Sequence, residues 1–178
     1  KTQALAPYFS EYALMKYRVV VEGEYLISLS LFGKTGLRKF SEAEIKKIRH
    51  AYELSVEDFE YIKSIETRTN HDVKAVEYFL KERLAETSLK DSIEWIHFGL
   101  TSYDINTPAR GMVLSDALEH VIIPKINSII ENIRLLSKKY KNLPMLARTH
   151  GQPATPSTFG KEMQVFATWI VPSNPNID

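Results

Sequence analysis

The sequence predicts an all-α chain with at most one short β-hairpin, near residues 146–154. Apolar residues recur every three or four positions through most of the 178 residues, which is the spacing of one helix face. Ser41 and Glu44 form the pattern of a capping box, a signal that opens helices. The best extended stretch is residues 143–148, which precede a turn containing glycine and proline.

The first predicted helix covers residues 8–32 and ends at Gly33 and Gly36. Its apolar positions fall three or four residues apart, as expected for a long amphipathic helix. The face is formed by Phe9, Tyr12, Met15 or Lys16, Val19, Gly23, Leu26, and Ser30 or Leu31.

The capping box at Ser41 predicts a second helix, and Ser55 marks a break and a restart that runs to about Thr67. After a polar turn, Asn70 or Asp72 is expected to cap the next helix. The inner stripe of that helix is predicted to be Val73, Val76, Leu80 and Leu84.

Residues 88–99 predict a short helix or turn, after which Thr101 or Ser102 is expected to cap the longest helix of the chain. A helix of about 35 residues usually packs into a bundle or across subunits, and Pro124 should kink it. Its expected core positions are Leu114, Leu118, Ile122, Ile126, Ile129, Ile133, Leu136 and Tyr140.

Residues 143–148 and those after Gln152 predict the hairpin, and residues 159–169 begin a last helix. We therefore expect a helical domain at residues 1–100, the start of a helical bundle at 101–170, and an irregular tail at 171–178. The two prolines and two asparagines of the tail do not continue a helix.

Composition excludes several classes of protein. Basic and acidic residues number 23 and 22 and are well mixed, giving a net charge of +1, so no nucleic-acid surface is indicated. The absence of cysteine excludes disulfides and thiolate metal sites. No apolar run approaches the roughly 20 residues of a membrane span. A cytoplasmic protein is the expectation.

Three histidines stand in polar segments that are typical of sites. His150 lies in a tightly turned loop, where a proton-transfer group is often placed, although an ordinary surface histidine fits as well. His71 lies at a helix start, where it is either part of a cap or near a bound anion. His97 is either a site residue or a packed core histidine, and Thr101 and Ser102 either only cap a helix or also hold a carboxylate.

Residues 149–155, Thr-His-Gly-Gln-Pro-Ala-Thr, resemble a motif of the adenylosuccinate lyase family within the fumarase/aspartase superfamily. Residues 67–78 and 96–106 are similar to two further stretches of that family, in the same order and spacing. The resemblance covers residues 9–167 and implies an all-α fold. It implies β-elimination of fumarate from adenylosuccinate and from the succinyl conjugate of the carboxamide ribotide.

The resemblance also implies roles for residues. His150 would be the general acid that protonates the leaving nitrogen, with Thr149 and Gln152 binding substrate. His71 would lie near the substrate phosphate, oriented by Asp72. The implied catalytic residues are thus His71 and His150, and the implied substrate-binding residues are Asn70, Asp72, His97, Thr101, Ser102, Thr149 and Gln152.

The same family implies a small-molecule substrate and a homotetramer whose active sites draw on several subunits. No metal or organic cofactor is implied, because the substrate carboxylate stabilises the carbanion. The serine base and a phosphate-binding arginine of the family would fall outside residues 1–178, so we expect this segment alone to be inactive. The alternatives are another superfamily lyase, such as argininosuccinate lyase, and a non-catalytic helical assembly module.

Overall fold

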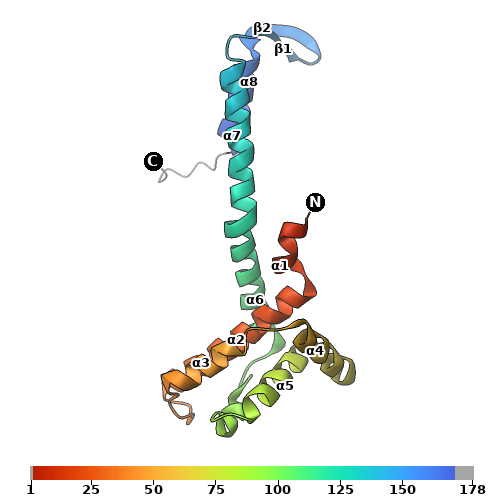
Figure 1. Cartoon of the computed structure of the whole chain (residues 1–178). Coiled ribbons are helices and arrows are strands. Elements are labelled where there is room, and N and C mark those ends of the chain that lie inside the picture. Colours follow the sequence, from red (N-terminus) through yellow and green to blue (C-terminus); the bar gives the residue numbers. More distant parts are fainter. Residues whose placement is uncertain (1, 171–178) are drawn as a thin grey trace. The chain divides into compact units, whose positions relative to one another are not determined.

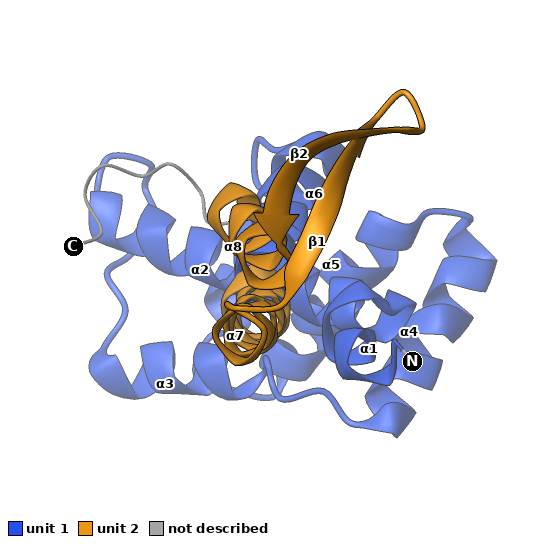
Figure 2. Cartoon of the chain, turned by 90° about the horizontal axis from the view of Figure 1, so that it is seen from above, with its two compact units in different colours: residues 1–117 blue, residues 118–178 orange. Residues whose placement is uncertain are grey.

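The computed structural model describes residues 2–170, and the chain divides into two compact units, residues 1–117 and 118–178 (Figure 2). The tail predicted to be irregular, residues 171–178, lies outside the described residues. The fold is all-α apart from one two-stranded antiparallel sheet, as predicted. Figure 1 traces the elements along the chain.

The regular elements described in the first unit are all helices. Its short 3₁₀ elements are η1 (Gln3–Leu5) and η2 (Lys90–Trp95). Its α-helices are α1 (Ala6–Phe9), α2 (Glu11–Phe32), α3 (Glu42–His50), α4 (Val56–Thr69), α5 (Asp72–Ala85) and α6 (Ser102–Ala117).

The predicted helix at residues 8–32 is wrong at its start, because the chain breaks at Ser10. The Ser10 backbone is extended, with ψ of 160°, and its hydroxyl oxygen accepts a hydrogen bond from the Ala13 backbone N–H at 3.1 Å. An N-cap residue requires this non-helical backbone, so Ser10 ends α1 and opens α2. Gly33 then ends α2 with a φ of 67°.

Two capping boxes begin the next helices. In α3 the Ser41 side chain accepts from the Glu44 backbone, and the Glu44 carboxylate accepts from Ser41 N–H at 2.9 Å, as predicted. Ser55 and Asp58 repeat the arrangement in α4. Each box satisfies two backbone donors that a helix start would otherwise leave without partners.

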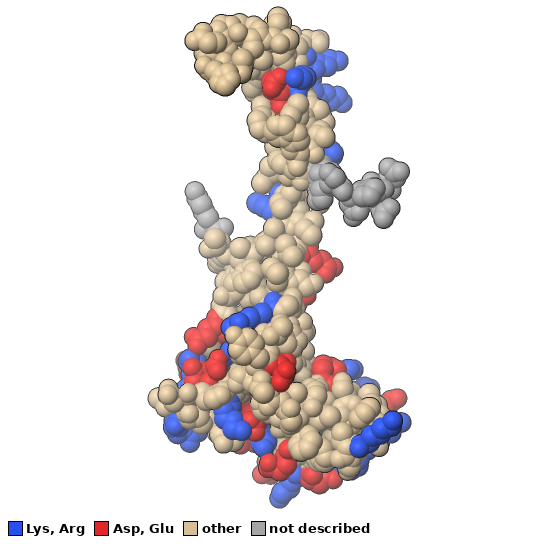
Figure 3. Space-filling model, turned by 180° about the vertical axis from the view of Figure 1, so that it is seen from behind, with Lys and Arg blue, Asp and Glu red and all other residues tan. Residues whose placement is uncertain are grey.

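The core of the first unit is formed where α2, α3, α4 and α5 bury their apolar faces. All four residues of the stripe predicted for α5 are buried. The largest fully buried side chains include Met15, Val19 and Leu26 of α2, Ile48 of α3, Ile62 and Ile65 of α4, and Leu80 and Leu84 of α5. On the face that Figure 3 shows, acidic and basic side chains are intermixed over the first unit, which fits the near-neutral charge.

A π-helical turn, η3 (Leu118–Ile122), joins α6 to α7 (Ile123–Lys139). A kink was predicted at Pro124, but the helix is irregular one turn earlier, at η3. Pro124 occupies the first turn of α7, where a backbone N–H is not needed for the helix. The predicted core face is also wrong in part. The buried positions are Ile105, Ala109, Val113, Ala117 and Ile130, whereas Leu114, Leu118, Ile126, Ile129 and Leu136 stay exposed.

The second unit packs α8 (Phe159–Ile170) against α7 and carries a hairpin of β1 (Pro144–Thr149) and β2 (Gln152–Thr158). The strands pair antiparallel, with an irregular register between Leu146 and Arg148. Gly160, in the first turn of α8, packs against the backbone of Lys141, since a Cβ at position 160 would lie 2.5 Å from Lys141 Cα. No helix within residues 2–170 is long and apolar enough to cross a membrane.

Candidate active site

The predicted acid, His150, lies at the tip of the hairpin together with Gly151. Both residues have positive φ, 49° and 75°, and Thr149 pairs with Gln152 across the turn. Two central residues with positive φ define a type I′ turn, whose twist matches that of the two strands. Glycine adopts this conformation without strain, which explains Gly151 beside the histidine.

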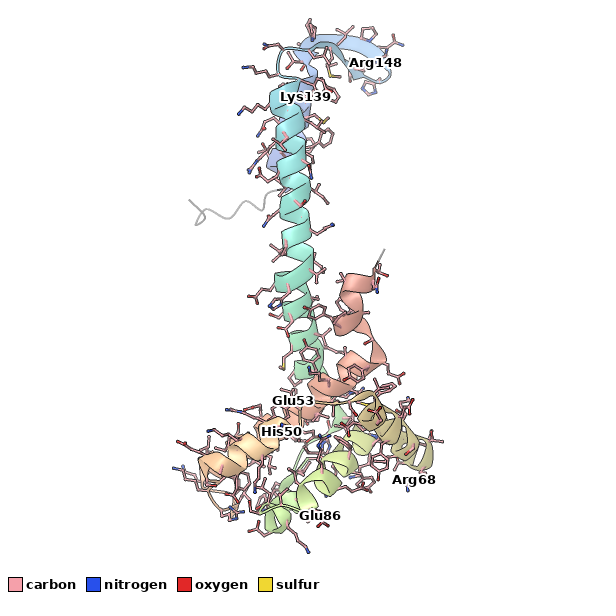
Figure 4. All side chains as sticks on the ribbon, viewed as in Figure 1. His50, Glu53, Arg68, Glu86, Lys139 and Arg148 are labelled. Carbon is pink, nitrogen blue, oxygen red and sulfur yellow. The ribbon has the colours of Figure 1, made fainter. Side chains whose placement is uncertain are left out.

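The turn places three candidates together at one exposed tip. Thr149, His150 and Gln152 are all exposed, and Thr149 and Gln152 pair across the turn that contains His150. Side chains of such a pair lie on the same face of a hairpin. Arg148, labelled in Figure 4, precedes the tip on β1. The local structure therefore exposes an imidazole on the turn that joins two residues with hydrogen-bonding side chains.

Helix α5 is capped by a histidine, which corrects the expectation of Asn70 or Asp72. The Nδ1 atom of His71 accepts a hydrogen bond from the Lys74 backbone N–H at 3.1 Å. Asn70 instead ends α4 in the left-handed conformation, with φ of 50°. Asp72 is the first residue of α5, and its Oδ1 accepts from its neighbour Val73.

The capping ring reaches the start of another helix. The Nε2 atom of His71 lies 3.4 Å from the Ser102 hydroxyl, and Ser102 is the first residue of α6. The N-termini of α5 and α6 thus meet at this pair. Both helix ends carry partial positive charge, so their junction favours an anionic group.

Thr101, one of the two residues expected to cap α6, holds the N-cap position, because α6 begins at Ser102. The Thr101 backbone N–H donates to the Asp104 carboxylate at 2.7 Å, which is the second half of a capping box. Ser102 lies inside the helix and not at its cap. Its hydroxyl is accordingly the one directed at His71.

A buried arginine joins these helices. Arg18 of α2 is 7% exposed, and it donates to Asp72 Oδ2 at 2.5 Å and to Asn106 Oδ1 of α6 at 2.8 Å. Burial raises the pKa of the Asp72 carboxyl, but Arg18 and the Val73 N–H outweigh burial and hold it below its usual range. Asp72 is therefore a charged anchor beside His71.

The third predicted histidine is held by a buried carboxylate. The Nδ1 atom of His97 lies 2.5 Å from Oε1 of Glu22, a residue of α2 with no exposed surface. Burial raises the pKa of Glu22, and the hydrogen bonds from the ring and backbone of His97 oppose that rise in part. His97 has φ of 62°, a conformation that costs free energy in any residue with a side chain.

The candidates divide between the units. The first unit holds Asn70, His71, Asp72, His97, Thr101 and Ser102, and the second holds Thr149, His150 and Gln152. Sequence reasoning missed Arg18 and Glu22. The apolar face predicted for the first helix did not include them, but they stand three and seven residues after Met15 and so share its side of the helix. A charged residue at a position that faces the core was the available signal.

His50 belongs to none of these motifs. His50, at the end of α3, is 3.4 Å from Glu53, and both are labelled in Figure 4. Within residues 2–170, no three histidine or carboxylate side chains gather closely enough to hold a metal ion.

A sequence profile of a family described as lyase matches residues 1–173. The chain belongs to this lyase family. Among curated relatives, the lyase chain is 49% identical to adenylosuccinate lyase of Dictyostelium discoideum, over 93% of this chain and 37% of that protein. It is 44% identical to adenylosuccinate lyase of Escherichia coli K12, over 92% of this chain and 36% of that protein.

Solved structures share the fold of this lyase chain. The β-carboxy-cis,cis-muconate cycloisomerase of Acinetobacter calcoaceticus superposes with a TM-score of 0.75 at 20% identity, covering 94% of this chain and 38% of that one. A fumarate lyase from Mesorhizobium gives a TM-score of 0.75 at 21% identity, covering 94% and 37%. The lyase chain therefore spans little more than a third of the proteins that it matches.

Proposed function

We propose that the whole protein is an adenylosuccinate lyase of purine nucleotide biosynthesis. The observation that carries this proposal is the 44–49% identity, over 92–93% of the chain, to enzymes of that name. The hairpin tip of Thr149, His150 and Gln152 adds local support, since it exposes an imidazole on the turn that joins two polar residues. The substrates would be adenylosuccinate and the succinyl conjugate of the carboxamide ribotide.

The reaction is a β-elimination. A base removes a proton from the carbon next to one succinyl carboxylate, the carbon–nitrogen bond breaks, and the nitrogen gains a proton. Adenylosuccinate then yields AMP and fumarate. His150 would supply the proton to the nitrogen, because histidine is the side chain most often used as a general acid.

The first unit would bind the anionic parts of the substrate. The junction of two helix N-termini at His71 and Ser102, with Thr101 beside it, suits a phosphate or a carboxylate. Asp72 would orient this region through Arg18 and would not touch an anion itself. Asn70 and His97 complete the proposed substrate-binding residues.

The active protein would be a cytoplasmic homotetramer whose sites draw residues from several subunits. Support comes from the apolar side chains that α7 and α8 leave exposed within the described chain, such as Ile123, Ile129 and Trp169. Exposed apolar surface of this kind usually marks an interface.

The test is product formation by the full-length protein that contains this chain. Incubation with adenylosuccinate should give equal amounts of fumarate and AMP, followed by ultraviolet absorbance and chromatography. Argininosuccinate is the matched comparison substrate. Turnover of argininosuccinate alone would transfer the assignment to another lyase of the superfamily, and turnover of neither would favour a non-catalytic assembly role.

A further inference from the structure

In the first unit, His71 and His97 each contact a neighbour through Nδ1. The neighbour of His71 is a hydrogen-bond donor, whereas the neighbour of His97 is an acceptor. His71 Nδ1 accepts a hydrogen bond from the Lys74 backbone N–H. That nitrogen must therefore be unprotonated, and the neutral ring carries its hydrogen on Nε2. His97 Nδ1 instead faces a carboxylate oxygen of Glu22 at 2.5 Å, which favours a hydrogen on Nδ1.

Apart from His97, few neighbours of Glu22 explain a carboxylate at this buried position. It lies within an apolar helix face, without exposed surface, and its Oε2 has no hydrogen-bond partner within residues 2–170. The groups that act on its carboxylate are the ring and backbone N–H of His97, with Glu77 of α5 as a further nearby charge. Burying a carboxylate is costly unless its partners compensate, so its one close partnership indicates a function.

The backbone around His97 is fixed to the same helix. Tyr25 of α2 donates its hydroxyl hydrogen to the Phe98 carbonyl oxygen at 2.9 Å. Glu22 and Tyr25 lie about one helical turn apart on α2. Glu22 holds the His97 ring, and Tyr25 holds the peptide that follows it. This support maintains His97 in its left-handed backbone conformation, with φ of 62°.

Helix α2 anchors both histidine segments. Arg18 holds Asp72, the residue after His71, and Glu22 holds His97. Residues four apart on a helix are neighbours on one face, with Cβ atoms about 5–6 Å apart. The two histidine-bearing segments are therefore attached to one face of α2, one turn apart.

We propose that Glu22 is a positioning residue that fixes His97 with its hydrogen on Nδ1, so that Nε2 of His97 accepts a hydrogen from the substrate. His71, held in the opposite form, donates from Nε2. The pair would recognise a substrate with an anionic group opposite His71 and a hydroxyl or N–H group opposite His97. This proposal rests on the proposed lyase function only for the identity of the substrate.

The first test is nitrogen NMR of the 178-residue chain labelled with ¹⁵N-histidine, at mildly alkaline pH. We expect a protonated Nδ1 and an unprotonated Nε2 in His97, and the reverse in His71. Glu22→Leu keeps a similar volume but removes the acceptor of the Nδ1 hydrogen, so the His97 ring should shift toward the form with its hydrogen on Nε2. Glu22→Asp retains a carboxylate and should keep part of the Nδ1–H form.

Glu44→Gln is the matched control, because Glu44 is also a buried glutamate of this unit and it pairs with Arg38 at 2.8 Å. This variant should leave both histidine signals unchanged. A hydrogen on Nε2 of His97 in the unsubstituted chain would overturn the proposal, since Glu22 would then be a donor. An unchanged His97 signal in Glu22→Leu would overturn it as well.

The second test is turnover by the full-length protein. Glu22→Leu should lower kcat/KM by about 10-fold, mainly by raising KM, because it weakens one hydrogen bond from the substrate to His97. Its thermal midpoint should not fall below that of the unsubstituted protein, since the variant removes a buried charge. In a His97→Gln background, Glu22→Leu should cause no further loss. Independent, multiplying losses would overturn the positioning role. If the unsubstituted protein lacks lyase activity, the proposed function fails, while the NMR result still decides the role of Glu22.

Discussion

At the scale of single residues, the candidate site depends on what each histidine ring touches. His71 closes the first turn of α5 through Nδ1 and presents Nε2 to Ser102. His150 instead lies exposed at a turn whose backbone requires positive φ. The His71 ring can thus both stabilise α5 and bind a ligand, whereas the His150 ring contributes less to the stability of the fold.

Substitution of His71 separates capping from binding. Asparagine is among the best N-cap residues, so His71→Asn should leave thermal stability nearly unchanged, whereas His71→Ala should lose about 1 kcal/mol. Neither variant retains the Nε2 donor, so both should show reduced kcat/KM in the full-length protein. Normal kcat/KM in His71→Asn would mean that His71 is only a cap.

Substitution of His150 tests the proposed general acid. Asparagine followed by Gly151 is the preferred pair for a type I′ turn, so His150→Asn should preserve the hairpin. Because asparagine cannot donate a proton as an acid, turnover should fall by roughly 10²–10⁴-fold. Near-normal turnover would remove the acid assignment.

At the scale of elements, caps and close backbone contacts decide where helices begin. Ser41 and Glu44 open α3, and Glu44 is also held by the Arg38 guanidinium. At the other end of the chain, Ser137 donates its hydroxyl hydrogen to the Gly160 carbonyl oxygen at 2.7 Å, which joins α7 to α8. These contacts give two local tests of stability.

The capping box of α3 should make stability depend on acid. The Arg38 guanidinium and the Ser41 N–H lower the pKa of Glu44 from 4.5 to about 2. Because the folded pKa is the lower one, the stabilisation is present above pH 4.5 and is lost as the pH falls toward 2. Glu44→Gln should lower the free energy of unfolding by about 1–2 kcal/mol at neutral pH. Denaturant titrations should show this difference shrinking across that range; a constant difference would contradict the assignment.

Glycine at the start of α8 should be indispensable. A Cβ at residue 160 would lie 2.5 Å and 2.7 Å from the Lys141 Cα and N atoms, which are backbone and cannot move aside cheaply. Gly160→Ala should therefore destabilise the second unit by about 1–3 kcal/mol. Gly111→Ala in α6 is the control, since nothing lies within 4 Å and alanine favours helix. Thermal unfolding of both variants measures the contrast, and equal midpoints would refute it.

At the scale of the whole molecule, the apolar residues that the chain does not bury require an explanation. In α7 the predicted stripe is mostly exposed, and in α8 Trp169 is exposed as well. Such residues cover no core in the described part of one chain. We therefore interpret them as a surface for self-association.

Self-association should depend on this surface. Ile129 of α7 is 49% exposed, so Ile129→Glu should weaken oligomers in the full-length protein by placing a charge in an apolar contact. Leu31→Glu is the control, because Leu31 is 58% exposed at the end of α2. Sedimentation should show dissociation for the first variant only. Unchanged assembly in both variants would exclude the face containing Ile129.

The sequence by itself determined the helical class, the capping box at Ser41, the restart at Ser55, the buried face of α5 and the hairpin around His150. These follow from periodicity and turn chemistry, which act over a few residues. Tertiary structure alone decided that Ser102 meets His71 and that Arg18 and Glu22 lie behind the histidine segments. Those contacts join residues 31, 54 and 75 positions apart. Only the packing of α2, α5 and α6 brings them together, and no local pattern encodes it.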